Sequence, residues 1–314
     1  MDTISIPNVV DPGVRKHFVD GYTQLKPQID KVFKIDKQES ETDEYKNYTG
    51  LSSYTQVNQG GEYDEDNPIQ SYGVNLTPVK FGKMVPVTYE MRKWAKTKEI
   101  WDASSMLGKA AARHVDQRGA DVFNNGRSAS YTSYSDAKPL FSTIHPRSDG
   151  GATQSNLSTT GIEFTEPNLE VGLLAVEYQL DDRGNLIDLM ASKLIIPSAL
   201  RREACVILKS DKKSGTGDND VNPYGIQEFY GVMKILVWKR LSAAAGGSDT
   251  AWTLQGSNHG LKWQWAEKPQ VFRDESVGFK TDTVYYKGRY YASNGWRDWR
   301  DMWNSAGDKA DIST

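Results

Sequence analysis

The sequence predicts an α+β fold, in which helices and strands occupy separate stretches of the chain. Three observations indicate this class: residues 89–124 repeat apolar side chains at helical spacing, residues 72–89 alternate them at strand spacing, and residues 271–303 form a β-rich tail. The chain has 314 residues, of which 38% are hydrophobic and 25% charged. This is a globular composition, long enough for one large domain or two ordinary ones.

Charge and cysteine content narrow the class of protein. The net charge of -3 gives no basic field for nucleic acid. Residues 1–66 contain 13 acidic and 7 basic residues, a balance of -6, so the remainder carries +3. This uneven distribution of charge is compatible with electrostatic contacts between copies of the chain. It is equally compatible with an acidic first segment that is simply solvated. The single Cys205 allows no intrachain disulfide, which fits a reducing cytosol. We see no signal peptide and no apolar run of membrane-helix length.

The first elements are a helical arm and a hairpin. Residues 9–35 predict a helix, because Asp11 can cap it, Pro12 suits its first position, and an apolar face follows at Val14, Phe18, Tyr22 and Leu25. After a polar stretch, residues 47–88 predict a long two-stranded hairpin from period-two alternation on both sides of Pro78.

The hairpin tip is the candidate contact site. It carries the residues Gly60, Gly61, Glu62, Tyr63, Asp64, Glu65 and Asp66. A lone hairpin is marginally stable in water, so a long one with polar faces is expected to lie on its own domain or on a neighbouring subunit.

The remaining helices and strands are predicted from the spacing of apolar residues and from the Pro, Gly and polar residues that end each element. A long helix is expected at 89–124, with a split near 96–99, and then a loop-rich region at 125–164. Further along we expect helices at 165–180 and 197–210, strands at 189–196 and 232–241, and mobile loops at 214–220 and 243–249.

The stretch PLFSTIHPRSDGG (139–151) places Ser142, His145 and Asp149 within eight residues. A catalytic triad needs these groups to converge in space, and closeness in sequence does not provide that. The stretch has no nucleophile-elbow pattern, and Ser and Asp in such loops usually form local turn bonds. We therefore expect a structural loop and no enzyme, and keep a hydrolase that uses His145 as an alternative.

Cofactor and metal motifs are missing as well. The four histidines are scattered, the acidic tip lacks calcium-loop spacing, and the glycine-rich runs lack the lysine of a phosphate-binding loop. We expect no cofactor and no metal. The Trp-rich stretches 263–265 and 295–303 could stack sugars, so a β-rich carbohydrate-binding protein is the second alternative, although core packing is the commoner role of Trp.

The order of the elements resembles a known family. An arm, an extended hairpin, a long spine helix, an inserted α/β region and closing strands resemble the tailed-bacteriophage major capsid protein of the Hong Kong 97-type fold. PLFSTIHP with Gly150-Gly151 and QSNLS (154–158) resembles Mu-type head subunits. The helix from Glu166, the strand 189–196 and the helix ending ILKS (207–210) resemble the axial domain, and RYYASNGWRDWRDMW (289–303) resembles the return strands.

The resemblance implies a domain order and an assembly. Residues 1–42 would be the N-terminal arm, 43–88 the extended loop, 89–160 the peripheral domain with its spine helix 89–124, 161–269 the axial domain and 270–314 the return strands. It implies homo-hexamers and pentamers that form an icosahedral shell around double-stranded DNA, with the extended loop lying over the neighbouring subunit. It also implies a portal and assembly in the host cytoplasm into a virion, without a membrane. Because the arm begins directly after Met1, we expect a separate scaffolding protein or none; decoration proteins are possible partners.

Overall fold

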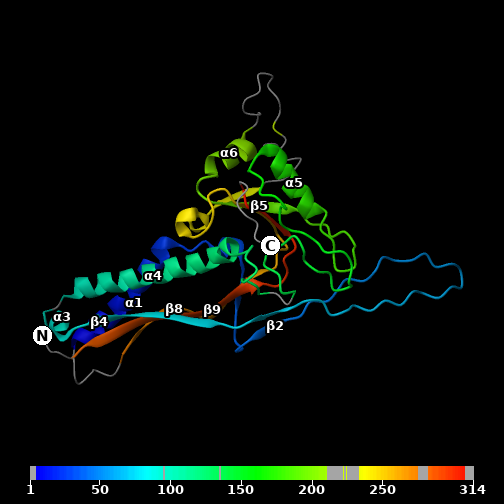
Figure 1. Cartoon of the computed structure of the whole chain (residues 1–314). Coiled ribbons are helices and arrows are strands. Elements are labelled where there is room, and N and C mark those ends of the chain that lie inside the picture. Colours follow the sequence, from blue (N-terminus) through cyan, green and yellow to red (C-terminus); the bar gives the residue numbers. More distant parts are fainter. Residues whose placement is uncertain are drawn as a thin grey trace, which may run out of the picture. The chain divides into compact units, whose positions relative to one another are not determined.

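The computed structural model describes residues 5–94, 96–133, 136–210, 222, 224, 233–274 and 282–307 (Figure 1). It combines helices with two sheets of mixed parallel and antiparallel pairing, which confirms the α+β class. The chain divides into two compact units. Unit 1 comprises Met1–Asp43, Leu76–Gly119 and Lys262–Asn294, and unit 2 comprises Glu44–Asn75, Ala120–Leu261 and Gly295–Thr314.

Unit 1 is built on a four-stranded sheet. Its strand order is β1 (Lys34–Lys37), β8 (Leu261–Arg273), β9 (Val284–Trp296) and β4 (Val79–Val87). β1 runs parallel to β8, and β4 runs antiparallel to β9. The helices α1 (Ser5–Leu25) and α4 (Thr97–Asn124) run alongside the sheet, as Figure 1 shows. The short helices α2 (Ile29–Val32) and α3 (Tyr89–Lys93) lead into β1 and α4.

The contact between α1 and α4 depends on glycine. A Cβ atom at Gly108 would lie 2.1 Å from the carbonyl oxygen of Phe18, and one at Gly21 would lie 2.2 Å from that of Ser105. The two backbones therefore approach more closely than any side chain allows. The predicted apolar face of the arm is confirmed at Val14 and Phe18, which are buried, whereas Tyr22 is half-buried and Leu25 is exposed.

Unit 2 contains the second sheet and a continuous apolar core. Its strand order is β10 (Met302–Ser305), β7 (Trp252–Gly256), β5 (Ala191–Ile196) and β6 (Lys234–Val237). The helices α5 (Glu166–Glu177) and α6 (Arg201–Lys209) lie near this sheet in Figure 1 and contribute Leu169, Leu173 and Ala204 to the core. Two short 3-10 turns, η1 (Lys239–Leu241) and η2 (Ala243–Ala245), follow β6.

The predicted pairing of the hairpin 47–88 is wrong. β4 pairs with β9, from Val79↔Ala292 to Val87↔Val284, and the short β3 (Val74–Leu76) pairs instead with β2 (Asp43–Tyr45). An isolated bridge, Tyr48↔Gln70, lies beyond β2 and β3, and residues 49–69 contain no strand. Alternation correctly identified a strand at 79–87, but it carries no information about the partner, and a distant strand supplied the pairing.

Most other elements lie where the sequence predicts them, but the arm helix predicted at 9–35 spans Ser5–Leu25, so Pro12 lies inside the helix and not at its first position. The helix 89–124 is split between Lys93 and Thr97, next to the expected position, and the helices at 166–177 and 201–209 are confirmed. The strand 232–241 shortens to β6 and η1, and β7 was not predicted. The predicted loop 214–220 lies outside the described residues. Among the helices that the structure describes, none combines the length and apolar character needed to span a bilayer.

Candidate inter-subunit contact site

The candidate site is the loop that joins β2 to β3, residues 46–73 of the chain. Its base is closed by backbone hydrogen bonds: Thr49 N donates to Ile69 O at 2.8 Å, and Ser71 N donates to Asn47 O at 2.8 Å. The Thr49 hydroxyl also accepts from Ile69 N at 3.0 Å. These bonds hold the two limbs together at the base of the loop.

Asp66 anchors one limb to the rest of unit 2. Its Oδ2 accepts hydrogen bonds from Ser52 N at 2.7 Å and from Ser52 Oγ at 2.8 Å. Its Oδ1 accepts from Arg183 Nη2 at 3.0 Å, and Arg183 also donates to Asn67 O. The hydrogen bonds from Ser52 lower the pKa of Asp66, because they favour the ionised carboxylate.

The apex of the loop makes few contacts with its own chain. Gly60 adopts a φ of 80°, a left-handed conformation that glycine accepts without strain, and Gly61 N donates to Asn58 O at 2.8 Å. Tyr63 is 84% exposed and Tyr54 is fully exposed. The loop therefore presents two large aromatic rings to solvent.

The structure separates the predicted site residues into two groups. Six of them lie at the exposed apex: Gly60, Gly61, Glu62, Tyr63, Asp64 and Glu65. Asp66 instead turns into the loop and binds Ser52 and Arg183. The sequence prediction missed Tyr54, which lies on the opposite limb. Its signal is an aromatic residue within a polar run, SSYTQ, between two expected strands.

The triad residues Ser142, His145 and Asp149 have other partners. The Ser142 hydroxyl accepts from Ile144 N at 3.2 Å, and Asp149 forms an ion pair with Arg147. His145 is fully buried, so it presents no reactive nitrogen to a substrate. These partners are the local turn bonds that the loop composition favours.

His145 belongs to a buried polar cluster instead. Its Nδ1 lies 2.8 Å from Asp136 Oδ2, its Nε2 lies 3.2 Å from Asn156 Oδ1, and its ring stacks on Trp299 with centroids 4.2 Å apart. Asn156 donates from Nδ2 to Leu140 O and to Trp299 O and accepts from Ser142 N. The side chains of His145, Asp136 and Asn156 are all hydrogen-bonded, which is the condition for burying them.

The tryptophan clusters do not form a binding platform. The members of the two Trp-rich stretches are all buried: Trp263, Trp265, Trp296, Trp299 and Trp303. A sugar-binding platform needs an exposed ring face, so these residues give the carbohydrate alternative no support. Among the described residues there is also no group of three or more His, Cys, Asp or Glu side chains placed to hold a metal ion.

Comparison with known proteins gives one family and several similar folds. The family model described as "Phage capsid protein" matches residues 72–304. A solved chain of Mycobacterium phage Adephagia is similar at 13% identity with a TM-score of 0.56, and covers 91% of both chains. A chain of Microbacterium phage Oxtober96 is similar at 12% identity and a TM-score of 0.53, with 90% of this chain and 91% of that chain covered.

A third solved structure, the capsid asymmetric unit of cyanophage Pam1, is similar at 12% identity and a TM-score of 0.54, with 89% of each chain covered. At these identities the likeness shows a shared fold. No curated protein matches the sequence.

Proposed function

This chain belongs to the phage capsid protein family, and we propose that it self-assembles as hexamers and pentamers into the icosahedral shell that encloses phage double-stranded DNA. The observation that carries the proposal is the family match over residues 72–304, together with a fold shared along nearly the whole chain with phage proteins. As a member of this family it is a structural protein of a virion. The family is a non-enzymatic one, consistent with a buried His145.

The loop 46–73 is the proposed contact between neighbouring subunits. The loop exposes Tyr54 on one limb and Tyr63 at its apex, where the acidic residues Glu62, Asp64 and Glu65 also lie. Holding such a segment extended in water costs conformational entropy without burial in return. A neighbouring subunit that covers the tyrosines supplies the missing burial. Aromatic residues are the type enriched in the cores of such interfaces.

The family order of domains remains our proposal for this chain. It assigns the arm to 1–42, the extended loop to 43–88, the peripheral domain to 89–160 and 270–314, and the axial domain to 161–269. The compact units cut the chain at other residues, so the domain names describe proposed roles in assembly. A portal, a separate scaffolding protein, decoration proteins and DNA at the inner face are proposed partners, and assembly is proposed to take place in the host cytoplasm.

Replacing residues 58–65 by Gly-Gly-Ser tests the proposal and keeps Asp66 with its anchor. The purified chain and the variant are compared by sedimentation velocity, and the heaviest fractions by negative-stain electron microscopy. We expect shells or capsomers from the natural chain and their loss in the variant, with the same thermal melting by circular dichroism. Normal shells from the variant would show that the apex is not the contact. A natural chain that remains a 35.2 kDa monomer, alone and with co-expressed phage scaffolding protein, would contradict the capsid function.

A further inference from the structure

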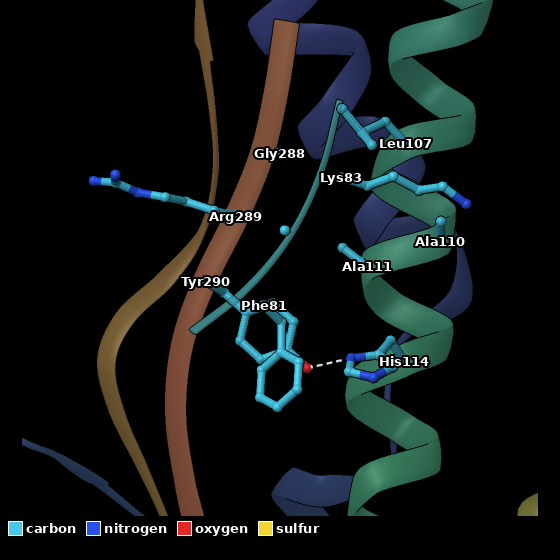
Figure 2. A pocket seen from close by; sticks show the side chains of 10 residues that line it. Phe81, Lys83, Leu107, Ala110, Ala111, His114, Gly288, Arg289 and Tyr290 are labelled. Carbon is cyan, nitrogen blue, oxygen red and sulfur yellow. Dashed lines mark hydrogen bonds between the residues drawn. The ribbon is translucent and has the colours of Figure 1, made fainter. Parts of the chain in front are cut away.

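A cavity of about 300 Å³ lies in unit 1, between α4 and the strands β4 and β9 (Figure 2). Its walls come from the residues Phe81, Gly82, Lys83, Leu107, Ala110, Ala111, His114, Gly288, Arg289 and Tyr290. We infer that this cavity is a binding site for a small aromatic anion of two fused rings. The inference is independent of the proposed capsid function, because it depends on unit 1 alone.

Small residues create the space. Ala110 and Ala111 face it from α4 and Gly288 faces it from β9, as Figure 2 shows, and Gly82 lines it with its backbone on β4. A hollow of this size beside an edge strand is large enough to hold a small molecule. β4 is the edge strand of its sheet, which leaves the cavity accessible from that side.

The volume and the walls select an aromatic ligand. An engineered apolar cavity of about 150 Å³ is enough to bind benzene, and pockets for small molecules begin near 300 Å³. The space of about 300 Å³ therefore suits two fused rings. Phe81, Leu107 and the two alanines give apolar walls, and the Phe81 and Tyr290 rings lie 5.3 Å apart, at the distance of an aromatic pair.

One corner of the cavity is formed by polar side chains that carry no negative charge, those of His114 and Tyr290. The Tyr290 hydroxyl lies 2.6 Å from His114 Nδ1, the bond drawn as a dashed line in Figure 2. Burial raises the pKa of Tyr290 to about 12, so its phenol stays protonated near neutral pH. This corner therefore offers hydrogen bonding and does not repel an acidic ligand.

The charge of the cavity favours an anion. Lys83 lies on the same face of β4 as Phe81, Val85 and Val87, where it interrupts an apolar row, and its side chain reaches towards α4 in Figure 2. Of the ten described residues that line the cavity, none is acidic. Arg289 points away from the space and forms an ion pair with Glu267, so Lys83 is the cation among the residues that line the cavity; the Arg118 guanidinium lies beside it, 4.4 Å from the centre of the Phe81 ring.

Two matched probes separate ring binding from charge recognition. 2-Naphthoate carries the ring and the negative charge, and 2-naphthylmethanol carries the ring alone. Each is titrated into the full chain by saturation-transfer NMR. We expect saturable binding of both, with 2-naphthoate about fivefold tighter because of one partly exposed charge pair.

Three variants locate the binding. Lys83→Gln should remove the fivefold preference for 2-naphthoate and leave the alcohol unchanged. Lys80→Gln, on the opposite face of the same strand and near the Tyr291 ring, should change neither. Ala111→Phe should fill the cavity and abolish both; if it does not fold by circular dichroism, Ala110→Leu replaces it. Absence of binding, equal effects of Lys83→Gln and Lys80→Gln, or unchanged binding to a folded filled variant would each overturn the inference.

Discussion

Two irregular segments of unit 2 have similar composition and opposite environments. Residues 136–157 and the loop 46–73 are both polar, both contain glycine, and neither has extended secondary structure. In the first segment His145 and Asn156 are fully buried, whereas in the second Tyr54 is fully exposed and Tyr63 nearly so. Segments of similar composition are therefore buried in one place and exposed in the other.

Hydrogen bonding accounts for the difference. The Asn156 side chain bonds Ser142, His145, Leu140 and Trp299, and so adds to the backbone bonds that join His145 to Gln154 and Asn156 to Ser142. Bonds within the loop 46–73 gather at its base, and its apex keeps only the turn bond of Gly61. Irregular backbone can enter a core when side chains satisfy its polar groups. Without such side chains it stays at the surface, available to another molecule.

The largest expected effect comes from breaking the buried cluster. His145→Ala leaves Asp136 without its buried partner and removes the ring stacked on Trp299. Leaving a buried carboxyl oxygen without its hydrogen-bond partner costs about 1–3 kcal/mol of the free energy of unfolding, and the lost ring contact adds to this cost. Urea unfolding followed by tryptophan fluorescence measures this loss, and Asp149→Ala, at a partly exposed pair, should change stability by less than about 1 kcal/mol. Equal losses of stability in the two variants would contradict the claim that the hydrogen bonds of His145 stabilise a buried core.

A smaller effect is expected from Asp66 as the pH falls. The pKa of Asp66 is lowered in the folded chain, so its bonds to Ser52 stabilise the loop above the unfolded value of about 3.9. That contribution is lost as the pH falls through the lower, folded pKa. The Ser52 amide signal in NMR should therefore shift only below the ordinary aspartate range, and Asp66→Asn should abolish the shift. A midpoint at the ordinary value would show that the anchor is not formed in solution.

The smallest effect on stability is expected at the apex. Tyr54→Ser and Tyr63→Ser remove exposed rings, so the free energy of unfolding should stay within about 0.5 kcal/mol of the natural chain. Assembly measured by sedimentation should weaken in both variants, because the proposed contact loses its aromatic anchors. Tyr178→Ser, an exposed tyrosine after α5, is the matched control and should leave assembly unchanged if the contact is restricted to the loop. A stability loss above about 1 kcal/mol at Tyr54 would place that ring in the core.

Local patterns in the sequence predict where helices and strands lie better than they predict which strands or side chains pair with one another. The spacing of apolar residues, together with capping and proline residues, predicts the helices at 166–177 and 201–209. A polar interruption predicts the split before Thr97. The pairing of β4 with β9 joins Val79 to Ala292, and no local pattern encodes a match over such a separation. His145 was found as a candidate, but Asp136 and Asn156 are its partners because the fold brings them together. In the loop 46–73, the sequence predicts the glycine turn at Gly60 and does not predict the hydrogen bonds of Asp66 to Ser52.

The parallel pairing of β1 with β8 fixes an order of events during synthesis. Lys34 pairs with Lys262, so β1 leaves the ribosome 228 residues before its partner (262 - 34). At roughly 5–20 residues per second, β1 waits on the order of 10–45 s for that partner. During this interval the amino-terminal strand has an unsatisfied edge, the kind of edge that pairs with other chains. Until β8 has been synthesised, β1 therefore remains available to pair with a strand of another chain.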